Sequence, residues 1–323
     1  MRNCNQEILN ALFKTKNLLS DEALFEIKSF VHSQHCETGG FIDRAGKADI
    51  YYSVFAYTLA LAYDINLDIV QEQEFLETWN TEYDLDLVHA VCYIRCYLLL
   101  QVIQQNQTFG LKLDNLDSEN FLAKLAMNKL IKKAKKNCKA QFEIIDSFRS
   151  KDGGYNHNVK SADQATVYAS FLVWTLFQDL NVGERTLNEI SQPISNLQCT
   201  DHSFANDASS ITGVSSATAA GLIMTLGQNN NKSSVIDYLM KNYTQRGGFK
   251  AAQDLPIADT LSTSTVLLAL YMANENLQNL SEKSIDFINL HWDESGGFFG
   301  SIADMTCDVE YTYYALLGIG ILL

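Results

Sequence analysis

The chain has 323 residues, of which 47% are apolar and 19% are charged, so it can bury a large core and is not disordered. It carries 24 Lys and Arg against 38 Asp and Glu, a net charge of −14. This charge argues against binding to nucleic acid, because phosphates require a basic face. Two prolines in the whole chain favour long helices over a fold of many strands and turns.

No segment has the pattern of a leader or of a membrane span. The N-terminus lacks an apolar signal core, and no run reaches the roughly 18–20 apolar residues that cross a bilayer. The seven cysteines are an odd number at scattered positions, which indicates reduced thiols rather than a disulfide framework. We therefore expect a cytoplasmic protein without a transmembrane segment.

A short motif recurs along the chain. Two glycines and an aromatic residue are followed, about ten residues later, by an Asp and a long apolar run. The clear copies lie at 39–41, 153–155, 247–249 and 296–298, and the Asp residues that follow them are Asp49, Asp163, Asp259 and Asp308. A degenerate copy at 202–204 keeps the spacing, and a copy without glycines stands at 84–86. A period in the forties indicates a repeat architecture.

Each repeat predicts a pair of helices. Segments that are apolar on nearly all sides are typical of buried helices, and they lie at 56–62, 167–177, 217–226, 266–272 and 311–322. Amphipathic segments alternate with them, at 72–79, 185–194, 235–243 and 282–292. Counting the copies gives six buried and six amphipathic helices. This number predicts an all-α fold, an (α/α)6 toroid that forms a single domain over residues 1–323, with an open solenoid as the alternative.

The recurring turn has a structural explanation. Glycine supplies a positive φ where an amphipathic helix ends and the chain reverses. The aromatic residue fills the seam between neighbouring helix pairs, and the Asp stands where the N-cap of the buried helix belongs. On this interpretation each Asp only caps a helix.

Glycine–glycine–aromatic turns that lead through an Asp to an apolar inner helix resemble the repeats of two groups of enzymes. These are the β subunits of protein prenyltransferases and the class II terpenoid cyclases, and the likeness covers residues 20–323. It implies an aromatic-lined cavity for an isoprenoid chain, with which the 17 Phe, 15 Tyr and 3 Trp are compatible. It also implies a protein partner as one option, because prenyltransferase β subunits pair with a helical α subunit.

The resemblance can be tested on the metal site. Protein prenyltransferases hold a catalytic zinc ion with an Asp, a Cys two positions later and a His on the last inner helix. Asp259 matches the Asp, but Leu261 stands at the Cys position and Tyr311 at the His position. Neither provides a zinc ligand of the usual kind. We therefore predict no metal ion and no other cofactor.

The resemblance also points to an acid motif. Class II cyclases protonate an alkene with an Asp-x-Asp-Asp segment, whose acid must be desolvated. Here the segment 84–87 keeps two of the three carboxylates, Asp84 and Asp86, and His89 follows one turn later. The catalytic hypothesis takes these three residues as an acid–base group with Asp86 as the proton donor. The alternative is a capped helix N-terminus with a polar neighbour.

Further polar residues stand at or near the N-terminal ends of the buried helices: Asp49, Tyr52, Asp163, Asp259, Glu310 and Tyr311. In a toroid these ends converge at one mouth. Carboxylates that converge there raise one another's pKa values and bind a ligand at the cavity. The alternative is that they point outward and only cap their helices.

These patterns predict a zinc-independent enzyme of the prenyltransferase and terpenoid-cyclase type. It would act on a hydrophobic, isoprenoid-like substrate in a central cavity by carboxylate acid catalysis. The incomplete motifs favour an alternative, a non-catalytic toroid that binds a lipid or a peptide, or a subunit of a larger complex. Another reaction on the same toroid is a third option, because a fold does not fix its function.

Overall fold

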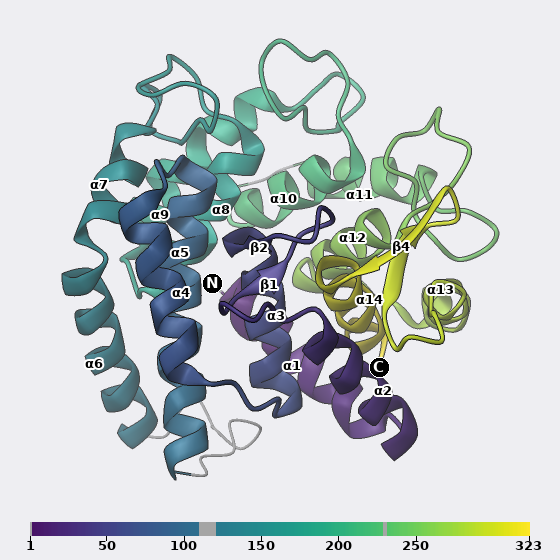
Figure 1. Cartoon of the computed structure of the whole chain (residues 1–323). Coiled ribbons are helices and arrows are strands. Elements are labelled where there is room, and N and C mark those ends of the chain that lie inside the picture. The colour runs from purple at the N-terminus through teal and green to yellow at the C-terminus, as the bar shows by residue number, and fades with distance from the viewer. Residues whose placement is uncertain (1, 110–120, 229–230) are drawn as a thin grey trace.

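The computed structural model describes residues 2–109, 121–228 and 231–323, with residues 109 and 121–126 described by their backbone alone. The described chain forms an (α/α)6 toroid, in which a ring of inner helices is covered by outer helices (Figure 1). The inner helices are α3 (Ile50–Tyr63), α5 (Leu87–Phe109), α8 (Val167–Asp179), α10 (Ser215–Thr225), α12 (Thr260–Met272) and α14 (Val309–Leu322). The outer helices are α2 (Asp21–Ser33), α4 (Ile69–Glu82), α6 (Phe121–Asn137), α7 (Lys139–Ser147), α9 (Glu184–Ser191) with the 3-10 helix η2 (Gln192–Leu197), α11 (Lys232–Lys241) and α13 (Gln278–Asn289).

The ring is closed. Inner helices that follow one another in the chain pack side by side, and α14 packs against α3. In Figure 1 the N-terminal helices accordingly lie beside the C-terminal ones. The prediction of an all-α toroid is therefore confirmed, and the open solenoid is excluded. Helix α5 is apolar and long enough to cross a bilayer, but it is an inner helix that is largely buried between α3 and α8.

The recurring turns need glycine for the backbone reason that the sequence suggested. The first glycine of each clear copy has a positive φ: Gly39 +86°, Gly153 +104°, Gly247 +98° and Gly296 +86°. In the degenerate copy His202 takes this conformation, with φ +70°. Only glycine adopts it without a steric cost, so the turn sequence follows from the chain reversal.

In three of the four clear copies the second glycine lies against an aromatic ring of an outer helix. A Cβ added to Gly40 would lie 2.4 Å from the Phe75 ring on α4, and one added to Gly248 would lie 2.5 Å from the Phe287 ring on α13. In the last turn a Cβ on Gly297 would lie 2.5 Å from the ring of Phe30, which belongs to α2. The last turn thus uses the first outer helix as its neighbour, which is how the outer layer closes.

In five of the six inner helices, all except α5, a hydroxyl one turn inside the helix ties the helix to its turn. The backbone N–H of the turn aromatic donates to a Ser or Thr four residues after the helix cap, as Phe249 does to Thr263 (2.9 Å) and Phe298 to Thr312 (3.1 Å). The same contact joins Phe41 to Ser53, Tyr155 to Ser170 and Phe204 to Thr218. Short hairpins β1 (Phe41–Ile42) with β2 (Ala48–Asp49) and β3 (Phe298–Ser301) with β4 (Asp304–Asp308) extend two of the turns.

An additional helix, α1 (Cys4–Leu18), was not predicted. Arg2, just before it, donates to the carbonyls of Tyr271 and Met272 at the C-terminal end of α12. Asn5 donates to Asp179 at the end of α8, and Lys16 pairs with Asp64 at the end of α3. Cationic groups suit the C-terminal ends of helices, whose last carbonyls are free. Helix α1 therefore spans the C-terminal ends of the inner helices and closes that side of the ring.

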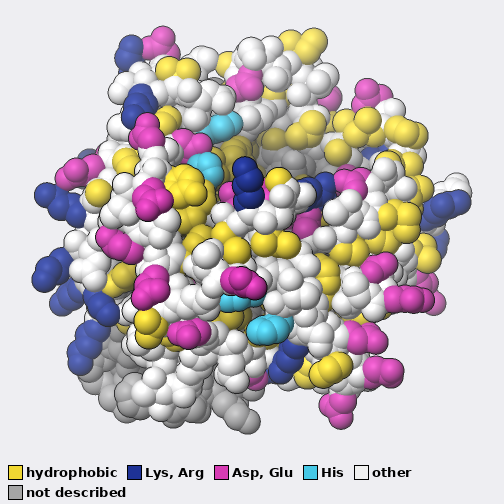
Figure 2. Space-filling model, in the orientation of Figure 1, with side chains coloured by type: hydrophobic (Ala, Val, Ile, Leu, Met, Phe, Trp, Pro, Cys, Tyr) yellow, Lys and Arg dark blue, Asp and Glu magenta, His cyan; other side chains and the backbone are white. Residues whose placement is uncertain are grey.

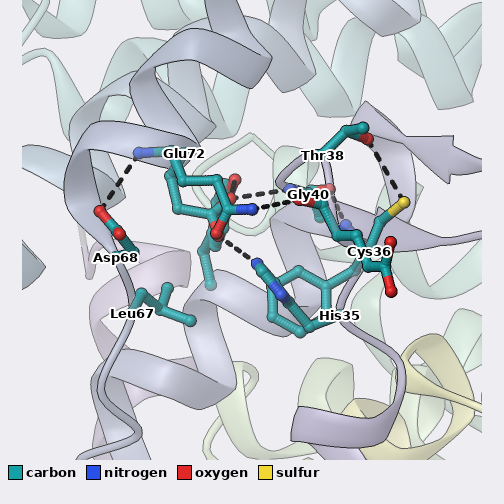
Figure 3. A network of polar contacts seen from close by, with 12 residues as sticks. His35, Cys36, Thr38, Gly40, Leu67, Asp68 and Glu72 are labelled. Carbon is teal, nitrogen blue, oxygen red and sulfur yellow. Dashed lines mark hydrogen bonds and ion pairs between the residues drawn. The ribbon is translucent and has the colours of Figure 1, made fainter.

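The first seam is held by a buried polar network (Figure 3). Glu72 of α4 has no exposed surface, and its Oε2 accepts bonds from the Gly40 N–H (2.8 Å) and from the Tyr57 hydroxyl. Its Oε1 contacts Nε2 of His35. Ser284 holds the corresponding position in another seam. Its hydroxyl bonds to the Tyr243 hydroxyl, with either group as the donor, and it donates to the Gly247 carbonyl. The network therefore joins the first turn to α4 and faces away from the ring centre.

Candidate functional site

The position of a residue relative to its helix cap determines whether its side chain faces the ring centre. Residues four positions after a cap lie toward the outer turn and are fully buried. Residues two, six and nine positions after a cap lie on the opposite side of the helix, because each residue rotates by about 100°. The residues at the ninth position are buried except Thr58 and Arg95, so the lining is formed by the second and sixth positions. Two layers result. The first comprises Tyr51, Val88, Tyr168, Ser216, Leu261 and Glu310, and the second comprises Phe55, Cys92, Leu172, Ala220, Thr265 and Tyr314.

The two layers line an open centre. All of their side chains except Cys92 remain partly exposed, although other inner helices surround them on all sides. Exposure in such a place indicates space between the helices. Figure 2 shows the corresponding face hollowed near its middle, with histidine and apolar side chains on the rim. The N-terminal ends of the inner helices surround this mouth, and α1 closes the opposite side.

Glu310 supplies the only carboxyl group in these two layers. Its Oε1 accepts a bond of 2.7 Å from the Tyr51 hydroxyl on α3, across the closing seam. Burial raises the pKa of Glu310 to about 7, although the Tyr51 hydroxyl lowers it in part. The rings of Phe55 and Tyr314, with centroids 5.8 Å apart, form the layer beneath. The site thus combines a carboxylic acid that is partly neutral near pH 7 with aromatic faces.

Arg44 joins the two hairpins beside this acid. Its Nε donates to Oδ2 of Asp308 (2.8 Å) and its Nη1 to Oδ2 of Asp304 (2.6 Å). The guanidinium lies over the ring of Tyr311, 5.0 Å from the centroid. Asp308 is only 3% exposed, and burial raises its pKa against the effect of Arg44 and of the Tyr311 N–H. This clasp holds the first and last repeats together at the mouth.

Three of the predicted carboxylates act as caps. Asp49 accepts bonds from the N–H groups of Tyr51 (2.8 Å) and Tyr52 (3.1 Å), Asp259 accepts from Ser262 (2.7 Å), and Asp308 accepts from Tyr311 (2.8 Å). Each therefore satisfies free amides at a helix N-terminus. Burial raises the pKa of Asp259.

The prediction for Asp163 is corrected. This residue does not cap α8. Its side chain is 82% exposed and pairs with Lys151 (2.6 Å) on the surface. The cap is Thr166, whose hydroxyl accepts from the Ala169 N–H. The loop between Tyr155 and the cap of α8 is three residues longer than the spacing from Tyr155 to Asp163. Asp163 therefore lies before the cap position.

Asp86 and His89 are in contact. Oδ1 of Asp86 accepts from the backbone N–H of His89 (2.9 Å) and bonds its Nδ1 (2.8 Å). This pairing lowers the pKa of Asp86 and raises that of His89. The Asp86 side chain is 52% exposed, and the neighbouring Asp84 is exposed too. The pair has the geometry of a cap, and its carboxylate is ionised at neutral pH.

The other two predicted residues flank the clasp. Tyr52 is partly exposed, and burial beside Asp308 and Glu310 raises its pKa to about 12. Tyr311 lies under Arg44 and against Gly300, where a Cβ would meet its ring at 2.3 Å. The mouth therefore brings together Asp49, Tyr52, Glu310 and Tyr311. Tyr51, Arg44 and the lining aromatics belong to the same cluster and were not predicted.

The closed ring of inner helices defines the class of this protein, an α/α toroid. The family model of the prenyltransferase alpha-alpha toroid domain matches residues 7–219 and 206–323. The chain belongs to this family. A search of curated proteins found no match.

The family's zinc site can be compared with the residues present. Asp259 and Tyr311 lie close enough for the charge of Asp259 to raise the pKa of Tyr311. However, Asp259 is engaged as a cap, and Leu261 and Tyr311 offer no zinc ligand of the usual kind. Among residues 2–109, 121–228 and 231–323, no group of three His, Cys, Asp or Glu side chains is placed to hold a metal ion. The described residues therefore do not fit a zinc ion.

Proposed function

We propose that this toroid is a zinc-independent enzyme that protonates a hydrophobic, isoprenoid-like substrate in its centre, with Glu310 as the acid. The observation that carries the proposal is the placement of the Glu310 carboxyl. It faces the open centre, is buried enough to hold a proton near neutral pH, and accepts the Tyr51 hydroxyl. An acid whose pKa lies near the working pH is suited to proton transfer.

The step is a proton transfer to a double bond. Oε1 is engaged by Tyr51, so Oε2 carries the proton. Its O–H bond breaks as a C–H bond forms at one alkene carbon, and the other carbon becomes a cation. The Tyr51 hydroxyl stabilises the carboxylate that remains, and the faces of Phe55 and Tyr314 stabilise the cation. The Glu310 carboxylate then accepts a proton from a carbon next to the cation, which forms a new double bond and regenerates the acid.

Asp86 was the acid that the sequence favoured, and Glu310 is the better candidate on physical grounds. The pKa of Asp86 is lowered by His89, so the group holds no proton at neutral pH. It is also exposed to water, which would capture a cation. None of the seven cysteines forms a disulfide, which supports a cytoplasmic location for the reaction.

Deuterium incorporation tests the proposal. Isoprenoid hydrocarbons, alcohols and diphosphates of increasing chain length would be incubated with the protein in D2O, and products analysed by mass spectrometry. We expect one deuterium per product in the wild type, loss of turnover by at least about 100-fold in Glu310→Gln, and a smaller loss in Tyr51→Phe. Asp163→Asn is the control, because that side chain lies on the surface. Equal turnover in Glu310→Gln would contradict the assignment.

The alternative is a toroid that binds a lipid or peptide without reaction. It is favoured by one observation: three of the carboxylates at the mouth, Asp49, Asp259 and Asp308, already serve as caps. In that case the wild type binds the same compounds, yields no product with any of them, and Glu310→Gln leaves binding unchanged.

A further inference from the structure

Arg95 lies deep in the toroid and faces its centre. It stands nine positions after Asp86, and therefore on the same side of α5 as the lining residue Val88. At about 1.5 Å per residue it lies about 13 Å below the cap. The side chain is nevertheless partly exposed. Because the inner helices enclose this depth and α1 closes the far side, the exposed surface of Arg95 faces the open centre.

The guanidinium of Arg95 lacks an acidic partner. One of its amino groups donates to the Thr175 hydroxyl on α8, whereas its Nε–H is fully buried and has no acceptor. None of the ion pairs formed within the described residues includes Arg95. A buried donor without an acceptor destabilises the folded state, and a buried charge does so more strongly. The charge of Arg95 therefore has no acidic partner among the described residues, and an oxyanion beside the guanidinium would neutralise it.

The groups around Arg95 do not supply this oxyanion. Arg95 acts electrostatically on the carboxyl of Asp179 at the end of α8, but that carboxyl accepts its hydrogen bonds from Asn3 (3.3 Å) and Asn5 (2.6 Å). Tyr168, Tyr313 and Tyr314 also lie within the electrostatic influence of Arg95. Trp174 precedes Thr175 on α8. Its indole Nε1–H is also buried without an acceptor.

Between this cation and the mouth the walls are mostly apolar. The second layer presents Phe55, Leu172, Ala220 and Tyr314 to the centre. The vertical separation between Glu310, two positions after its cap, and Arg95, nine positions after its cap, is about 10 Å. A ligand that satisfies Arg95 must therefore place an oxyanion at the bottom and fill an apolar space above it.

We propose that Arg95 forms an anion-binding subsite at the bottom of the toroid, and that the ligand is an amphipathic molecule that enters with its carboxylate or phosphate head first and its apolar chain toward the mouth. This orientation is independent of the chemistry at Glu310. The head group accepts charge-assisted hydrogen bonds from the guanidinium of Arg95, a group that suits carboxylates and phosphates.

Binding of simple amphiphiles tests the proposal. Dodecanoate, dodecyl phosphate and dodecanol would be titrated below their micelle concentrations by isothermal calorimetry into the full chain, together with inorganic phosphate. We expect the wild type to bind at least one of the two anions at least about tenfold more tightly than the alcohol, since a charge-assisted hydrogen bond favours the anion. The preferred anion distinguishes a carboxylate from a phosphate head group.

The variants separate binding from folding. In Arg95→Met the preference for the anion should disappear while binding of dodecanol is retained. Because Arg95 has no ion pair to lose, Arg95→Met should unfold at the same temperature as the wild type or higher. Arg149→Gln is the matched control, since Arg149 pairs with Glu189 on the surface. Equal affinities for dodecanol and both anions, or an unchanged preference in Arg95→Met, would overturn the proposal. So would a strong destabilisation by Arg95→Met, which would show a structural ion pair, or binding of inorganic phosphate as tight as that of the amphiphiles.

Discussion

The hydroxyl of Tyr51 donates a hydrogen bond of 2.7 Å to the carboxyl of Glu310, across the seam where the last inner helix meets the first. Two residues separated by almost the whole chain thus share one contact at the mouth of the ring. The contact exists only because the toroid closes. It links the closure of the fold directly to the group that we propose as the acid.

Glu310 should make stability depend on pH. Its pKa in the folded protein, about 7, lies above its ordinary value of 4.5. The stability that it contributes is complete below pH 4.5 and is lost as the pH rises through about 7, because the unfolded chain releases the proton first. In Glu310→Gln this loss is absent. We would measure the free energy of unfolding in urea. From acidic to mildly alkaline pH, its value for Glu310→Gln relative to the wild type should rise by on the order of 1–3 kcal/mol. Glu294→Gln, an exposed control, should show no such gain, and a constant difference for Glu310→Gln would contradict the assignment.

The Arg44 clasp should stabilise the closing seam. Arg44→Ala leaves Asp308 buried with the Tyr311 N–H but without its cation. We expect a loss of about 1–3 kcal/mol in the free energy of unfolding at neutral pH. Lys151→Ala breaks the exposed pair with Asp163 and serves as the control, with no measurable change expected. Equal effects of the two substitutions in urea denaturation would show that the clasp is a surface contact only.

The last turn should tolerate no side chain at Gly297. A Cβ there would lie 2.5 Å from the ring of Phe30, so Gly297→Ala should destabilise the protein by about 1–3 kcal/mol. Gly183→Ala has open space around it and should be nearly neutral. The double variant Gly297→Ala/Phe30→Leu should lose less than the sum of the two single variants, because the smaller side chain makes room. Additive losses, measured by thermal unfolding, would mean that α2 does not pack on the last turn.

His89 should report its pairing with Asp86. The pKa of His89 is raised above 6.5 by this contact, so the imidazolium stabilises the fold below that pH and the contribution is lost as the pH rises through the folded pKa. In Asp86→Asn, NMR titration of the His89 ring should show the pKa falling toward 6.5 or below. Asp84→Asn, at an exposed neighbour, should leave it unchanged. The opposite pattern would transfer the pairing to Asp84.

The repeat architecture could be predicted because the turn motif has strict local causes. A positive φ at the first glycine and close packing against the second leave few alternatives, so these two glycines mark the four clear copies. The caps Asp49, Asp259 and Asp308 followed for the same reason. Helix α1 was missed because it belongs to no repeat. Asp163 was misplaced because the third loop is longer, and a threonine serves as its cap.

The site was harder to predict because it is assembled across the ring. Glu310 and Tyr52 were identified as residues near helix ends, but nothing in the sequence joins Tyr51 to Glu310 or Arg44 to Asp308. These contacts depend on which helices become neighbours when the ring closes. Arg95 could have been noticed in the sequence, because it is the one Lys or Arg in the apolar stretch from Leu87 to Leu100. Its position nine residues after Asp86 places it on the inner side of the helix once the cap is known.

The most direct test of the account is the titration of the Glu310 carboxyl itself. Protein labelled with 13C at the glutamate side-chain carboxyl would be titrated by NMR, and the signal assigned from its absence in Glu310→Gln. We predict a midpoint near pH 7, and a higher midpoint in Tyr51→Phe, because the hydroxyl that stabilises the carboxylate is lost. A midpoint near the ordinary value of 4.5, unchanged in Tyr51→Phe, would show an exposed carboxylate at the mouth and would contradict the proposed acid.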